Sequence, residues 1–152
     1  MSNELRQRAL RLLSLRDHAR AELKKKLAPH AESEEALEAL LDDLAGRHLL
    51  SDNRYAEMRV STRGARYGNA RLAQELKMQG VSAEDTAEAI AGAGDELARA
   101  HGIWTRKFGT LPVDASERAR QTRFLMNRGF SAETIRRLLR GEGGEPWNAE
   151  NN

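Results

Sequence analysis

The chain has 152 residues, of which 39% are hydrophobic and 32% charged, and its 25 Lys and Arg against 23 Asp and Glu leave a formal net charge of +2. It contains no cysteine, which excludes a disulfide framework and a thiolate metal site, and no apolar run approaches the roughly 20 residues that a membrane-spanning helix needs. Good helix formers dominate and β-branched residues are scarce, so we expect an all-α fold.

The first 20 residues, MSNELRQRALRLLSLRDHAR, are amphipathic and rich in arginine, as transit peptides often are. Glu4 and Asp17 argue against a transit peptide, because such segments are poor in acidic residues. The leucine spacing instead predicts a structural helix over 4–15, with an apolar face made of Leu5, Ala9, Leu12 and Leu13. We therefore expect a soluble, cytoplasmic protein.

A short motif recurs further along the chain. Residues 80–84 read GVSAE and residues 129–133 read GFSAE, within the longer frames ELKMQGVSAE and FLMNRGFSAE. The segment ELKKKL at 22–27 is a weaker copy, and aligning Leu23, Leu76 and Leu125 gives spacings of 53 and 49 residues. Repeats of about this period are typical of helical arrays, so we predict three tandem units.

The repeated motif has the residues of a corner between two helices. Gly80 and Gly129 suit the left-handed conformation that closes a helix, and the apolar residue after each glycine would fold back onto that helix. Ser82 and Ser131 suit the N-cap of the next helix, each cap contributing about 1 kcal/mol.

Three helices are predicted in each unit, and a unit of this size buries too little surface to be stable alone. The units should therefore stack into an elongated array. The predicted helices span 4–15, 17–28, 33–47, 52–64, 69–79, 82–91, 95–107, 115–128 and 131–140. The predicted units are 1–48, 49–92 and 93–140, followed by a disordered tail, 141–152.

Catalytic and metal-binding patterns are missing from the sequence. His18, His30, His48 and His101 are scattered without metal-ligand spacing, and no GxxxxGK[ST] phosphate loop occurs. We predict a protein that is not an enzyme and that has no cofactor and no metal site.

Basic residues concentrate in the last third of the chain. Residues 1–50 carry 9 basic and 9 acidic groups and residues 51–94 carry 6 and 6, whereas residues 95–140 carry 10 and 5. Arginine suits phosphate and carboxylate because its planar fork donates in pairs, although solvated helix faces with i,i+4 pairs would look similar. The candidate anion-binding residues are Arg63, Arg66, Arg71, Lys77, Arg106, Lys107, Arg118, Arg120, Arg123, Arg128, Arg136 and Arg137. Among them, Arg120, Arg123 and Arg128 are expected to share a broad face of one helix.

Four segments, in this order, resemble the RecX family: RDHARAELKKKL at 16–27, LLSDNRYAE at 49–57, RGARYGNARLAQELKMQGV at 63–81 and RFLMNRGFS at 123–131. The resemblance covers residues from about 8 to 140. It implies tandem three-helix units that bind RecA and lodge in the groove of its filament on single-stranded DNA. It further implies suppression of strand exchange, ATP hydrolysis and co-protease activity.

Matched positions in these motifs suggest roles for individual residues. The resemblance implies that Tyr55 is a core anchor, that Arg63 is an exposed contact, and that Arg123 and Arg128 contact the partner. Asn69-Ala70 and Gln79 stand where the family often has basic residues, which weakens the case for strong DNA binding by the second unit.

Two other functions remain open from the sequence. The chain could be a helical nucleic-acid-binding module that acts without RecA, using its basic third unit to contact DNA directly. It could also be a helical adaptor that binds neither. In each case a monomer is expected.

Overall fold

The computed structural model describes residues 2–144, with no side chain described for Ser2. Within that part of the chain every regular element is helical, so the predicted all-α class is confirmed. Of the predicted disordered tail, 141–152, residues 145–152 lie outside the described residues, whereas Glu142 pairs with Arg137 and Arg140 of the last helical segment.

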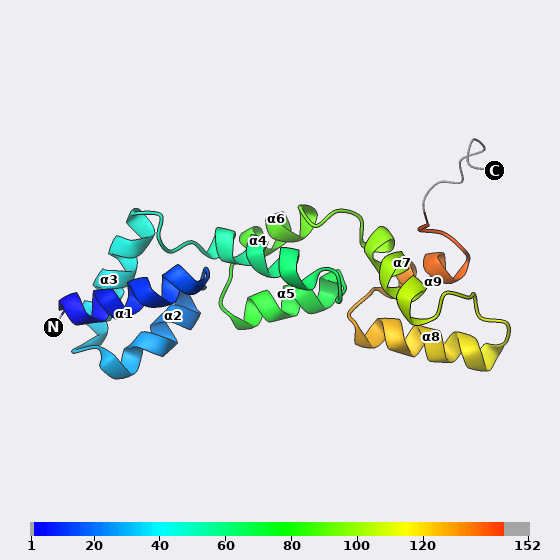
Figure 1. The fold of residues 1–152 in the computed structure, drawn as a ribbon, viewed down its shortest axis with the longest axis horizontal. Coiled ribbons are helices and arrows are strands. Elements are labelled where there is room, and N and C mark those ends of the chain that lie inside the picture. Colours follow the sequence, from blue (N-terminus) through cyan, green and yellow to red (C-terminus); the bar gives the residue numbers. More distant parts are fainter. Residues whose placement is uncertain (1, 145–152) are drawn as a thin grey trace.

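The helices form three consecutive triplets, which lie side by side in a row along the long axis of the molecule (Figure 1). The first unit contains α1 (Ser2–Leu15), α2 (Arg20–Leu27), a short 3-10 helix (Ala28–His30) and α3 (Glu34–Gly46). The second contains α4 (Asp52–Arg63), α5 (Asn69–Met78) and α6 (Ala83–Ala91). The third contains α7 (Glu96–Lys107), α8 (Ala115–Asn127) and α9 (Ala132–Leu139). The predicted tandem arrangement is therefore confirmed.

Each unit has its own apolar core, built from the residues that recur at helical spacing. The first core is mostly leucine, including Leu23 and Leu41, and both side chains are fully buried. Tyr55 and Leu76 lie in the second core, and Trp104 and Leu125 lie in the third. The sequence-based assignment of Tyr55 as a core anchor is therefore correct.

The two copies of the repeated motif have the predicted geometry. Gly80 and Gly129 both have a left-handed backbone, with φ of 77° and 92°. The amide after each glycine then donates back to a carbonyl of the helix just ended, from Val81 to Leu76 at 3.1 Å and from Phe130 to Leu125 at 3.2 Å. Both apolar side chains are buried as a result. The N-cap serines that follow, Ser82 and Ser131, accept the amides of Asp85 and Thr134.

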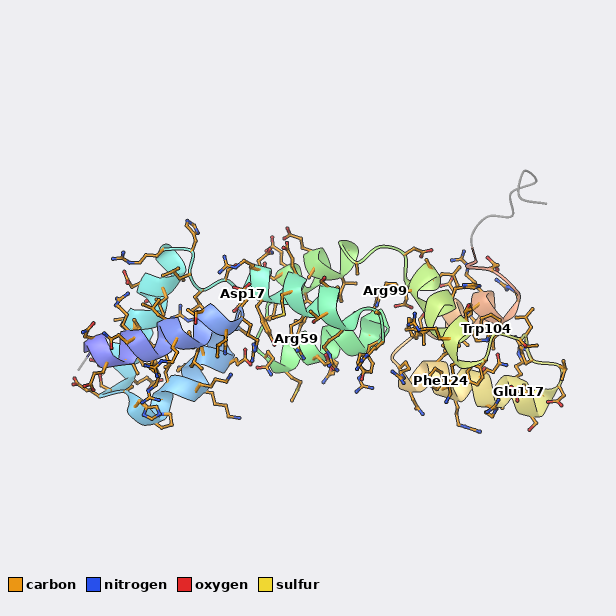
Figure 2. All side chains as sticks on the ribbon, in the orientation of Figure 1. Asp17, Arg59, Arg99, Trp104, Glu117 and Phe124 are labelled. Carbon is orange, nitrogen blue, oxygen red and sulfur yellow. The ribbon has the colours of Figure 1, made fainter. Side chains whose placement is uncertain are left out.

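The start of α2 differs from the prediction, which placed it at residue 17. Ala19 has an extended backbone and its side chain packs in the core of the second unit. Asp17, labelled at this boundary in Figure 2, accepts the Nε of Arg54 at 2.7 Å, and the amide of Arg20 donates to Asp52 at 2.7 Å. These contacts with the second unit hold residues 17–19 out of the helix and join the first two units.

Candidate functional site

The second and third units meet through direct backbone contact. The amide of Gly68 donates to the carbonyl of Arg128 at 2.7 Å, and that of Ala70 donates to Gly129 at 3.2 Å. A Cβ on Gly68 would collide with the carbonyl of Gly129, and a Cβ on Gly129 would collide with Arg71. The junction therefore needs glycine at both positions.

Arg99 of α7 binds the loop between α4 and α5 across the same junction (Figure 2). Its Nε donates to the carbonyl of Gly64 at 3.0 Å, and one Nη donates to the carbonyl of Tyr67 at 2.6 Å. The other Nη donates to the side-chain oxygen of Asn69 at 2.6 Å. Burial lowers the pKa of the Arg99 guanidinium, and these three acceptors replace the water that the cation loses.

One carboxylate at the start of α7 fixes two further helices. Glu96 accepts the backbone amide of Asn69, at the first residue of α5, at 2.9 Å. Its other oxygen accepts the hydroxyl of Thr134 at 2.9 Å and the amide of Ser131 at 3.3 Å, at the start of α9. Acidic groups are favourable at helix N-termini, because unpaired amides point at them. Glu96 thus ties α5 of the second unit to α9 of the third.

A groove opens on this fixed junction, and we call it the junction groove. It encloses a volume of about 470 Å³. Two aromatic rings and four cations line it, with no carboxylate among the lining residues, which are Ala65, Arg66, Tyr67, Ile103, Arg106, Lys107, Phe124 and Arg128. The four cations come from both units and were all predicted as anion-binding residues.

Cations lie over both aromatic rings of the groove. Arg71 lies 4.1 Å from the centre of the Tyr67 ring, and Arg128 lies 5.6 Å from it. Arg128 also lies 5.0 Å from the Phe124 ring, and Lys107 lies 5.4 Å from that ring. Cations are attracted to ring faces at such distances. Arg128 therefore links the aromatic residue of the second unit to that of the third.

Backbone carbonyls hold two of the groove cations without neutralising them. Arg106 donates to the carbonyl of Ala65 at 3.0 Å, and Arg128 donates to that of Arg66 at 3.5 Å. Each guanidinium carries five donors, so most of them stay available. Among the described residues no ion pair engages Arg66, Arg106, Lys107 or Arg128. The groove can therefore bind an anion with paired, charge-assisted hydrogen bonds.

Arg63 is less free than the sequence suggested. Its Nε and one Nη donate to the two oxygens of Glu75, at 2.7 and 2.6 Å, and its side chain is only 28% exposed. The Glu75 carboxylate raises the pKa of Arg63. Arg63 also lies over the Tyr67 ring, 4.6 Å from its centre.

The other predicted cations lie away from the groove. Arg118 and Arg123 line a different hollow of α8, together with Ala119 and Thr122, whereas Arg128 lines the junction groove. The helix ends at Asn127, and Arg128 turns toward the junction. Arg120 pairs with Glu117 at 2.9 Å and lies over Phe108. On α9, Arg137 pairs with Glu142 at 3.2 Å and Arg136 is exposed. Lys77 lines an apolar groove between α5 and α6.

Three residues of the site were missed at the level of sequence. Tyr67 stands between Arg66 and Arg71 in the segment RYGNAR, and such interleaving of aromatic and basic residues could have indicated it. Phe124 follows Arg123 in the same manner. Nothing in the sequence marks Arg99, because its acceptors are mainly carbonyls of a distant loop.

Other chemistries find no support in the described residues. Between residues 2 and 144 no three His, Asp or Glu side chains are grouped closely enough to hold a metal ion. In the same range no helix has the length and apolarity to cross a membrane. His18, one of the four scattered histidines, is buried.

Family models match two of the three units. Residues 51–90 match the model described as the second three-helix domain of RecX, and residues 94–139 match the third three-helix domain.

Relatives that this chain matches over most of their length are also RecX proteins. The chain is 48% identical over 137 residues to the regulatory protein RecX of Chromobacterium violaceum, covering 90% of both chains. It is 48% identical over 149 residues to the regulatory protein RecX of Ralstonia nicotianae, covering 93% of this chain and 94% of the relative.

Solved structures share the fold. The crystal structure of RecX from Lactobacillus salivarius superposes with a TM-score of 0.79 at 19% identity, over 93% of this chain and 96% of that one. A second crystal structure, of a regulatory protein RecX, gives a TM-score of 0.74 at 21% identity, over 93% of this chain and 73% of that one.

Proposed function

The chain belongs to the RecX family of regulatory proteins, and from this premise we propose that it binds RecA and the filament that RecA forms on single-stranded DNA. In this proposal the protein occupies the filament groove and inhibits strand exchange, ATP hydrolysis and co-protease activity. It acts as a cytoplasmic monomer.

The junction between the second and third units is the observation that carries the proposal. Two backbone hydrogen bonds, Arg99 and Glu96 fix these units relative to each other. A rigid, elongated array of this kind can follow a helical groove and contact several protomers at once. The four cations of the junction groove would face the part of the filament that carries negative charge.

The proposed mechanism follows from occupancy of the filament groove. A protein that bridges neighbouring RecA protomers has to be displaced before those protomers can rearrange. Bridging would therefore slow the turnover of ATP and block the approach of a second DNA molecule. Nothing in this mechanism requires the regulator to perform chemistry.

Hydrolysis of ATP by RecA in the presence of single-stranded DNA tests the proposal. The chain is titrated against a fixed RecA concentration, well below one copy per protomer and with DNA in excess. Loss of hydrolysis at these ratios supports action on the filament. Inhibition that begins only when the chain saturates the DNA would instead support the alternative, a nucleic-acid-binding module that acts without RecA. No inhibition at any ratio would contradict both.

A further inference from the structure

We propose that the junction groove is a nucleotide-binding site. In this site a phosphate is held by Arg66, Arg106, Lys107 and Arg128, while a nucleobase stacks on the side of the groove lined by Phe124 and Tyr67. The inference rests on the proposed function in one respect, since it assigns a ligand to the surface that would face the filament. The binding itself requires only this chain, so it can be tested without RecA.

The charge of the groove favours a phosphate. Four cations converge on one cavity, and the lining includes no acidic residue. Glu75 does not line the groove, and Arg63 donates to both of its oxygens. Arg66 and Lys107 have no carboxylate partner within residues 2–144. Like charges held this close repel one another, so a bound dianion or a phosphodiester chain would relieve the repulsion.

The aromatic rings favour a nucleotide over inorganic phosphate alone. Tyr67 and Phe124 both line the cavity and are partly exposed. Guanidinium groups already lie over both rings, with Arg71 4.1 Å and Arg63 4.6 Å from the Tyr67 centre and Arg128 5.0 Å from the Phe124 centre. A flat base can stack on an aromatic ring or on the plane of a guanidinium, and proteins that bind single strands combine both contacts in a basic groove.

Single strands fit this groove better than duplexes. The bases of a duplex are stacked on one another, so their faces cannot reach Phe124 or Tyr67. An acidic protein segment could satisfy the four cations, but it has no flat base to stack on the rings or on the guanidinium planes beside them. The combination of rings and cations therefore points to a nucleoside phosphate, whether free or as part of a strand.

The junction between the second and third units also holds Phe124 and Tyr67 in position before any ligand binds. Phe124 belongs to α8, and Tyr67 belongs to the loop that Arg99 binds. The close contact of Gly68 with Gly129 fixes the position of that loop against the end of α8. Less ordering is then needed on binding, which favours affinity.

The first test measures binding to a short, fluorescein-labelled oligothymidylate by fluorescence polarisation, with RecA absent. The variant Arg66→Glu/Lys107→Glu reverses two groove cations. The matched control Arg8→Glu/Arg11→Glu makes the same change in net charge at two exposed residues of α1. We expect the groove variant to lose roughly tenfold or more in affinity and its salt slope to fall by about 1.4, while the control stays within about twofold. Equal losses in both variants would overturn the site.

A second variant separates stacking from charge. Phe124→Leu keeps an apolar side chain and removes the ring. We expect roughly tenfold weaker oligonucleotide binding with an unchanged salt slope. Because Phe124 also packs edge-on against Phe108, 5.4 Å away, helicity and thermal melting are measured for the same sample. If that variant unfolds, Tyr67→Leu tests the other ring. Full affinity in a folded ring variant would overturn the stacking part of the proposal.

Competition identifies the source of the nucleotide. Unlabelled oligothymidylate, ATP and polyglutamate are each titrated against the labelled complex. Displacement by ATP supports a free nucleotide as the ligand, and displacement by oligothymidylate alone supports a strand. Polyglutamate that competes as well as the oligonucleotide would overturn the nucleotide assignment. RecA-dependent ATP hydrolysis, measured with the same variants, tests the proposed function separately.

Discussion

Gly68 lies against Gly129 so closely that a side chain on either residue would collide with the other unit. The two glycines come from different repeats, one from the loop before α5 and the other from the turn after α8. Gly129 has a left-handed backbone, with φ of 92°, as the helix-ending motif requires. The same turn therefore ends a helix and docks the neighbouring unit.

Replacing Gly68 with alanine tests the importance of this contact. The added methyl group would meet the carbonyl of Gly129 and the amide of Phe130, and both are backbone atoms that cannot turn away. We expect the free energy of unfolding to fall by about 1–3 kcal/mol in urea denaturation. Gly102→Ala is the control, because Gly102 lies within α7 with open space around it. That variant should gain about 0.5–1 kcal/mol. A Gly68→Ala protein as stable as the wild type would contradict the packing described.

Arg99→Lys is expected to loosen the same junction. Lysine keeps the charge but has no planar fork, so it cannot reach the carbonyls of Gly64 and Tyr67 and the side chain of Asn69 together. We expect a loss of about 1.5–3 kcal/mol in the free energy of unfolding. Hydrogen exchange of the Gly68 amide should also become faster. Arg123→Lys, at an exposed residue of α8, is the control and should change neither quantity. Unchanged exchange at Gly68 would show that Arg99 is not needed to hold the junction.

His18 makes stability depend on pH. Its ring is only 2% exposed, with Nδ1 3.0 Å from the carbonyl of Arg16 and Nε2 3.0 Å from the ammonium of Lys26. Lys26 can only donate, so Nε2 accepts and the ring is neutral. Burial, together with the charges of Arg16 and Lys26, lowers the pKa of His18, although the hydrogen bond to the Arg16 carbonyl and the nearby Glu22 carboxylate oppose the shift.

The direction of the pH effect follows from that lowered pKa. In the unfolded chain the ring takes up its proton near pH 6.5, whereas in the folded chain it does so at lower pH. The stabilisation is complete above pH 6.5 and is lost as the pH falls, with a slope of at most about 1.4 kcal/mol per pH unit from this group. His18→Gln should remove that slope between pH 6.5 and pH 5. His30→Gln, at an exposed residue, should retain it. Identical profiles for wild type and His18→Gln would rule out this role.

Charge reversal at the end of α8 tests the link to RecA. Arg123→Glu/Arg128→Glu should weaken inhibition of RecA-dependent ATP hydrolysis while helicity stays unchanged. Arg128→Glu alone should account for most of the effect, raising the concentration for half-inhibition roughly tenfold, because Arg128 lines the junction groove and Arg123 does not. Arg8→Glu, on α1, provides the single-charge control. Undiminished inhibition by the double variant would remove both residues from the contact surface.

Local sequence patterns were sufficient for much of the fold. Gly80 and Gly129 each end a helix, and Ser82 and Ser131 each begin the next one, as predicted. These features depend on a few neighbouring residues, so they can be read from short segments. The start of α2 could not, because Ala19 stays extended through its contact with the second unit.

The sequence by itself determined the all-α class, the tandem repeat and the set of cations from which a site could be built. Only the tertiary structure decided which of these cations act together. Glu75 occupies Arg63, whereas Arg66, Lys107 and Arg128 converge with Tyr67 and Phe124 where the units meet. Helix formation depends on contacts within a few residues, but this groove depends on contacts between segments far apart in the chain. The close packing of Gly68 against Gly129 brings those segments together.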